Sequence, residues 1–150
     1  MSKAIAKAEE VIKSKTAELN PGVGVTLSLL DHEGYPTTST LSISKADGIR
    51  QITFATGLNS NKVKRAKQDK RASVCIFGDD YAGGECYNIT LVGDVEILTD
   101  AEIKKATWYD GLEEHFPGGI DDPNYCVLKF VTKRYNLWVD IEEEATTGSF

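Results

Sequence analysis

The chain has 150 residues, of which 41% are hydrophobic and 27% charged, and its formal net charge is −6. This length suits one domain over residues 1–150 with a hydrophobic core of its own. The negative charge disfavours nucleic acid as the main partner, and no apolar run approaches the ~20 residues of a membrane span. The N-terminal residues mix charges throughout and lack the apolar centre of a secretory signal, so we expect a cytoplasmic protein.

The cysteines and histidines do not form a metal-binding pattern. No two of the three cysteines, Cys75, Cys86 and Cys126, are closely spaced, and the two histidines, His32 and His115, are far apart in the sequence. We therefore expect reduced thiols, with Cys75 and Cys86 buried on strands, and no metal site. No nucleophile–base motif is present either, so the sequence identifies no catalytic residue.

The first third of the chain predicts one helix and three strands. Residues 2–19 are rich in Ala, Glu and Lys with apolar residues at helical spacing, and Ser2 can cap this helix. Asn-Pro-Gly at 20–22 ends it. Strands are expected at 23–30, 35–44 and 50–56, joined by tight turns at 31–34 and 45–48, with Gly34 at a positive φ.

The remainder predicts more strands, interrupted by helices. Strands at 72–78 and 86–98 flank a Gly-rich loop, and Gly93 indicates a bulge. A helix runs from 101 to about 115, and a turn is expected at 121–124. Residues 125–131 and 135–141 form either one bent strand or a pair, and 142–150 form an acidic and polar tail. With about six to seven antiparallel strands, the fold is mostly β, a barrel with flanking helices.

The junction after the third strand has the features of a phosphate-binding cradle. Gly57 suits a positive φ, and Asn59 or Ser60 can cap the helix that follows. A helix N-terminus attracts anions, and Lys62 in its first turn favours one further. Residues 62–71 carry six positive charges and one negative, a basic segment in an acidic protein. The alternative is an ordinary capped helix with a solvated basic face.

Four segments of the chain follow one another in an order typical of one protein family. They are Glu33-Gly34-Tyr35-Pro36; Phe54-Ala55-Thr56 with Ser60-Asn61-Lys62; Gly93 to Asp100 with Trp108; and Phe116 to Tyr125 with Tyr135-Asn136-Leu137-Trp138. With these four segments in this order, the chain resembles the pyridoxamine 5'-phosphate oxidase-like flavoproteins of the FMN-binding split-barrel fold. The short general-stress-protein branch of that family is the most similar.

The resemblance implies an FMN site. Its phosphate would lie at Ser60 and Lys62, with the hydroxyl of Thr56, and the strand around Thr40 would follow the flavin ring. Asn88 and Trp138 match family positions near the ring. The candidate cofactor residues are Ser39, Thr40, Leu41, Ala55, Thr56, Ser60, Asn61, Lys62, Asn88 and Trp138.

The chain also departs from the family pattern. Relatives place cations where this chain has Ser39 and Asn61, and the full oxidases place another near Ser44. Either Lys64 or Arg65 substitutes for them, or another flavin or a deazaflavin is preferred. The C-terminal Arg-x-His pair that grips the substrate phosphate in pyridoxamine phosphate oxidases is absent from residues 140–150, so we do not expect that activity.

The resemblance therefore implies a homodimeric FMN-dependent oxidoreductase with flavin sites at the dimer interface. NADH or NADPH is the expected reductant, and the small-molecule substrate and acceptor are unknown. The alternative is a flavin-binding protein without turnover, serving as a carrier or a stress-related protein. A third hypothesis, nucleic-acid binding through residues 62–71, is disfavoured by the acidic remainder of the chain.

Overall fold

The computed structural model describes residues 2–80, 82–139 and 144–150. Its helices are α1 (Lys3–Ser14), α2 (Asn61–Gln68), α3 (Ala101–Thr107) and the short 3-10 helices η1 (Leu112–Glu114) and η2 (Gly119–Asp121). Its strands are β1 (Val25–Leu30), β2 (Pro36–Leu41), β3 (Ile43–Asp47), β4 (Gln51–Gly57), β5 (Arg71–Asp80), β6 (Glu85–Leu98), β7 (Tyr125–Trp138) and β8 (Thr146–Ser149).

The strands form one antiparallel sheet that curls back on itself. Their order is β2-β1-β5-β6-β7-β4-β3, and β8 pairs with the C-terminal half of β7. The two outermost strands, β2 and β3, are separated in the chain by Ser42 alone. The covalent chain therefore brings the two edges of the sheet together. This is the predicted antiparallel split barrel, with eight strands in the described residues instead of six or seven.

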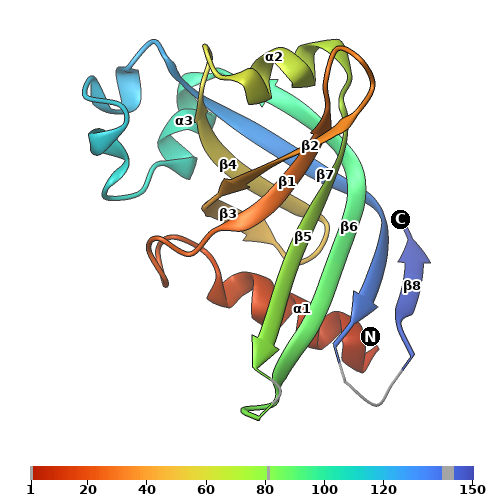
Figure 1. Ribbon diagram of the computed structural model, residues 1–150. Helices are drawn as coiled ribbons and strands as arrows, with labels where there is room; N and C mark the ends of the chain where they lie inside the picture. The colour runs from red at the N-terminus through yellow and green to blue at the C-terminus, as the bar shows by residue number, and fades with distance from the viewer. Residues whose placement is uncertain (1, 81, 140–143) are drawn as a thin grey trace.

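The interior of the barrel is apolar, and two helices cover its ends. Alternate residues of β1, β4 and β5 are buried, as expected for strands with one face on a core. Figure 1 shows α2 across one end of the curved sheet and α1 across the other. Ile12 of α1 and Val63 of α2 are both completely buried in the same cluster as Phe54. The core thus holds α2, and with it the predicted cradle, against the sheet.

The first half of the chain departs from the predicted boundaries at two points. The N-terminal helix ends at Ser14, not at 19, because Thr16 forms a parallel bridge with Ile43 and Ala17 donates its N–H to the carbonyl of Ile43. The strand predicted at 35–44 is two strands, divided at Ser42. Their pairing explains the division, since β2 pairs with β1 whereas β3 pairs with β4.

The second half departs in three places. The helix predicted to reach residue 115 ends at Thr107, and Gly111, at φ 106°, precedes η1. The two alternatives for the last strand resolve into one, β7, which continues to Trp138; residues 140 and 141 lie outside the described part. The tail contains a strand, β8, although residues 142 and 143 also lie outside that part.

Two local predictions are confirmed. Gly34 has φ 86° in the β1–β2 turn. The register between β6 and β7 shifts between Val92 and Gly93, which is the predicted bulge. A Cβ at Gly93 would overlap the carbonyl of Val131, so only glycine fits there.

Candidate functional site

The cradle is built where β4 ends and α2 begins. Ser60 is the N-cap of α2, and its Oγ accepts the N–H of Val63 at 3.3 Å. Thr56 is the second-to-last residue of β4, and its hydroxyl lies 3.4 Å from the same Oγ. The N–H groups of Asn61 and Lys62 have no carbonyl within the helix to donate to. Two hydroxyls and two free N–H donors therefore gather at the positive end of α2.

The loop before Ser60 is held differently from the prediction. Gly57 does not adopt a positive φ; it is the last residue of β4 and pairs with Tyr125. The loop is instead fixed by Asn124, whose carbonyl accepts the N–H of Leu58 at 2.8 Å and whose Oδ1 accepts that of Asn59 at 3.2 Å. A Cβ atom at residue 57 would lie 2.9 Å from the Nδ2 of Asn124, which explains why this position is a glycine.

Asn124 was not among the residues proposed from the sequence. It lies in the turn predicted at 121–124, and Asp122 shapes that turn by accepting the N–H groups of Asn124 and Gly118. These bonds lower the pKa of Asp122. A turn signal was visible in the sequence. Nothing in it indicated contact with a loop 65 residues earlier.

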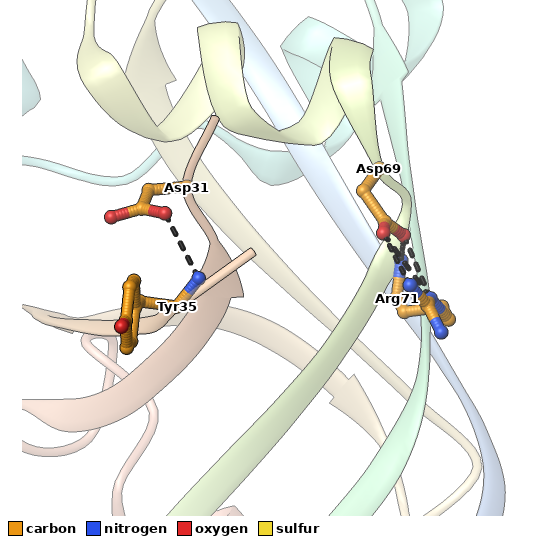
Figure 2. A network of polar contacts seen from close by, with 4 residues as sticks. All are labelled: Asp31, Tyr35, Asp69 and Arg71. Atoms are coloured by element: carbon orange, nitrogen blue, oxygen red, sulfur yellow. Dashed lines mark hydrogen bonds and ion pairs between the residues drawn. The ribbon is translucent and has the colours of Figure 1, made fainter. Parts of the chain in front are cut away.

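The charges of the basic segment are divided between the two ends of α2. The first turn of α2 contains no acidic residue. Beyond its other end, Arg71 forms an ion pair with Asp69 at 2.7 Å, drawn in Figure 2, and Lys70 lies 3.9 Å from Asp94. Hydrogen bonds from Arg71 lower the pKa of Asp69 to about 2. Arg71 and Lys70 thus each lie beside a carboxylate, although Asp94 is also paired with Lys133 at 2.9 Å.

The two cations considered as replacements differ in their surroundings. Asp31, on the β1–β2 turn, accepts the N–H of Tyr35, and this bond is the main cause of its lowered pKa; the charge of Arg65 contributes least. That turn borders the same surface pocket as Gln68 and Asp69 at the C-terminal end of α2. Among the described residues no ion pair involves Lys62, Lys64 or Arg65. Because Lys64 lies one residue nearer the start of α2, it is the better candidate to supplement Lys62.

A second group of candidates meets on the outside of the sheet. Asn88 of β6 is paired directly with Trp138 of β7 and, on its other side, with Phe77 of β5. The Oδ1 of Asn88 accepts the hydroxyl of Thr90 at 3.3 Å and lies 3.8 Å from the Sγ of Cys75. Cys86 is buried as predicted, but Cys75 is only partly buried because it lies on this outer face.

The candidates on β2 and β4 do not share one surface. Thr40 pairs with Thr26, Thr26 with Cys75, and Cys75 with Thr90, so these residues form one row across the outer face of the sheet. Leu41, in contrast, packs against the main core. Ser39, two residues before Leu41, has the same orientation by alternation. Ala55 packs in a separate apolar cluster with Leu112, Phe116, Tyr125 and Val127. The structure thus unites Thr56, Ser60, Asn61 and Lys62 in one place and Asn88 with Trp138 in another.

The described residues contain neither a cluster suited to a metal ion nor a helix suited to a membrane. No group of three or more Cys, His, Asp or Glu side chains is arranged to hold a metal ion. No helix in the described part has both the length and the apolar character needed to cross a membrane.

Comparison with known proteins places this geometry in context. Residues 22–149 match a family model described as pyridoxamine 5'-phosphate oxidase like. A Clostridium acetobutylicum protein related to general stress protein 26 of B. subtilis, of the pyridoxinephosphate oxidase family, is 26% identical with a TM-score of 0.81. That alignment covers 99% of this chain and 95% of the other. No curated protein matches the chain.

More distant structures share the fold. General stress protein 26 from Bacillus anthracis str. Sterne is 16% identical, with a TM-score of 0.78, over 99% of this chain and 100% of that one. A heme binding protein from Mycobacterium smegmatis is 17% identical, with a TM-score of 0.77, over 99% of this chain and 59% of that one.

Proposed function

The chain belongs to the pyridoxamine 5'-phosphate oxidase-like family, and on this premise we propose that it binds FMN and acts as a flavin-dependent oxidoreductase. NADH or NADPH is the proposed reductant, and the acceptor is a small molecule not yet identified. Because its three cysteines are free thiols, we place the protein in the reducing environment of the cytoplasm.

The observation that carries this proposal is the donor set at the start of α2. The hydroxyls of Thr56 and Ser60, the free N–H groups of Asn61 and Lys62, and the ammonium group of Lys62 are all suited to a phosphate. No carboxylate in the first turn opposes an anion. These residues fit the terminal phosphate of FMN.

The residues of this chain would bind and orient the cofactor. Thr56 and Ser60 would donate hydroxyl hydrogen bonds to the phosphate, while Lys62 neutralises charge and Asn124 keeps the loop in shape. When bound, the flavin itself supplies hydride and electron transfer, which explains why no catalytic side chain is evident.

We propose that the protein is a homodimer through the outer face of β1, β5, β6 and β7. We call this the open sheet face; its residues are Thr26, Ser28, Thr40, Ser73, Cys75, Phe77, Asn88, Thr90, Val92, Arg134, Asn136 and Trp138. Arg134 is the one charged residue among these twelve, and the next row along β5 and β6 is the charged pair Arg71 and Asp94. Figure 1 shows no helix of the described part over β1, β5 and β6.

The composition of this face supports an interface. The core of an interface is depleted in charge and enriched in aromatic residues, and Phe77 exposes 59% of its surface here. Asn88 and Trp138 would then lie at the boundary between the two chains. The binding site of a flavin held by α2 of one chain would be completed by this face of the partner chain, as the resemblance implies.

The first test is the visible spectrum of freshly purified protein, with mass spectrometry of the released chromophore. A flavin spectrum and the mass of FMN are expected. A Soret band would instead indicate a heme, the ligand of the Mycobacterium smegmatis neighbour. A colourless protein that takes up no added FMN would contradict the proposal.

A second measurement separates an enzyme from a flavin carrier. NADH or NADPH is added to the flavin-loaded protein without oxygen, and the flavin absorbance is followed. An oxidoreductase is expected to bleach. Unchanged absorbance with both reductants, and with a range of acceptors, would favour a non-catalytic flavin-binding protein.

A further inference from the structure

Residues 118–124 form a turn that contains η2 and leads directly into β7. Because Tyr125 of β7 pairs with Gly57 of β4, this turn ends beside the loop that precedes α2. None of the ten residues considered for FMN lies within the turn. The turn therefore borders the phosphate cradle without supplying any of the groups assigned to it.

The backbone of the loop before α2 is held at three successive N–H groups. The carbonyl of Asn124 accepts the N–H of Leu58 at 2.8 Å, and its Oδ1 accepts that of Asn59 at 3.2 Å. The N–H of Ser60 is accepted within the loop by the carbonyl of Gly57 at 3.0 Å. The free donors of the cradle begin at the next residue. Asn124 therefore determines the course of the backbone that leads to those donors.

Asn124 is held in turn by the carboxylate of Asp122. One oxygen, Oδ1, accepts the N–H of Asn124 at 2.9 Å, and the other, Oδ2, accepts the N–H of Gly118 at 3.0 Å. These two bonds, chiefly the one from Asn124, lower the pKa of Asp122, so the group is charged at neutral pH. Hydrogen bonds to a charged acceptor are stronger than those between neutral groups. A single side chain thus joins the two ends of the turn.

Helix α3 is attached to the same residue. The Nζ of Lys104 donates to the carbonyl of Asp122 at 3.1 Å and lies 5.2 Å from the centre of the Tyr125 ring. The turn is also closely packed, since a Cβ at Gly118 would lie 3.0 Å from the Cα of Asp122. A continuous series of contacts therefore runs from α3, through the turn, to the loop that precedes the cradle.

We propose that Asp122 is a positioning residue of the phosphate site and acts through Asn124. This inference rests on the FMN binding proposed above. Asp122 fixes the backbone of Asn124, and Asn124 fixes the loop. The loop then keeps the hydroxyl of Ser60 beside that of Thr56. A loop held in this conformation before the ligand arrives has less conformational entropy to lose, so the phosphate binds more tightly.

Two flavins separate positioning of the phosphate from general damage to the protein. Riboflavin has the ring and ribityl chain of FMN but no phosphate, so only FMN depends on the cradle. Both are titrated into the flavin-free full chain, and flavin fluorescence is followed. Asn124→Ala is expected to weaken FMN about tenfold and riboflavin by no more than about twofold. A variant that merely loosens the fold would weaken both flavins alike.

Variants of the carboxylate test Asp122 itself. Asp122→Ala is expected to weaken FMN about fivefold, with riboflavin again little changed. Asp122→Asn keeps one acceptor oxygen and is expected to recover part of that loss. Asp121→Ala is the matched control, because this exposed carboxylate lies in the same turn and takes no part in the bonds described above. It is expected to keep the wild-type ratio of the two affinities.

Amide exchange at Asn59, measured by NMR on the flavin-free full chain, is a second reading that needs no ligand. Asn124→Ala is expected to exchange this N–H about fivefold faster or more, whereas Asn124→Asp keeps an acceptor and stays close to the wild type.

The outcomes distinguish this inference from the proposed function. A wild type that binds no FMN would contradict both. A wild type that binds FMN, with Asp122→Ala and Asn124→Ala at the wild-type ratio of FMN to riboflavin affinity, would overturn the positioning role alone. Unchanged exchange at Asn59 in Asn124→Ala would overturn it as well.

Discussion

Lys62 is the residue on which the proposed phosphate site depends most directly. Lys62→Ala is expected to weaken FMN binding by about 1.5–3 kcal/mol, the range for hydrogen bonds to charged groups. Titrating the apoprotein with FMN and following flavin fluorescence measures this. Lys70→Ala is the matched control, because Lys70 lies beyond the C-terminal end of α2 and 3.9 Å from Asp94. Equal losses at both positions would show that α2 contributes only diffuse charge.

Cys126 gives a residue-scale prediction for stability. Burial raises the pKa of its thiol from the ordinary value of 9.0 to about 11. As pH rises between these values, the unfolded chain loses this proton and the folded chain keeps it, so the free energy of unfolding falls. Burial raises the pKa values of Tyr109 and Tyr125 as well, which adds to the fall at still higher pH.

Urea unfolding across about pH 9 to 11 tests this prediction. Cys126→Ala is expected to show a shallower decline than the wild type, and Cys75→Ala, which removes a thiol from a partly buried site, is the matched control. Identical slopes for wild type and Cys126→Ala would contradict the assignment.

At the scale of elements, α3 is fastened to β7 by one buried phenol. The hydroxyl of Tyr125 donates to the carbonyl of Lys104 at 2.8 Å and lies 2.9 Å from the Oγ1 of Thr107. Trp108 and Phe116 pack against its ring, with centroids 5.3 and 5.2 Å away. The helix is short, and its N-cap Asp100 makes no side-chain capping bond, so it relies on this anchor.

Tyr125→Phe keeps the ring and removes these bonds. The free energy of unfolding is expected to fall by about 1–3 kcal/mol, because buried polar groups lose their partner. Urea unfolding measures the change. Tyr35→Phe is the control, since Tyr35 is 66% exposed and should alter stability by less than about 0.5 kcal/mol. A Tyr125→Phe variant as stable as the control would mean that packing alone holds α3.

For the whole molecule, the open sheet face is the proposed dimer interface. Phe77→Asp would place a carboxylate beside Asn88 on this face. We expect it to convert a dimer into a folded monomer, because a carboxylate buried in an apolar interface is strongly disfavoured. Phe77 is exposed in the single chain, so its replacement removes no contact within the core and the variant should still fold.

Light scattering during size-exclusion chromatography measures the mass of the wild type and the variant. Tyr35→Asp, another exposed aromatic residue outside the open sheet face, is the control and should remain dimeric. A wild-type protein that is monomeric, or a Phe77→Asp variant that stays dimeric, would rule out this interface.

Local features were the ones that the sequence determined by itself. The cap at Ser60, the turn at Gly34 and the bulge at Gly93 depend on a residue and its near neighbours, and all three were predicted correctly. An antiparallel barrel also followed, because consecutive strands with short turns have few arrangements open to them, and the family resemblance implied the split barrel. The family segments placed four candidates at one helix end by their spacing alone.

The tertiary structure decided what depends on distant contacts. Ser42 divides β2 from β3 because β2 pairs with β1 at one edge of the sheet and β3 pairs with β4 at the other. The strand at 146–149 exists only through its pairing with β7. Asn124 holds a loop 65 residues away, and Asn88 meets Trp138 across a sheet. Neither pairing leaves a periodicity or spacing in the sequence, because side chains brought together by register carry no local signal.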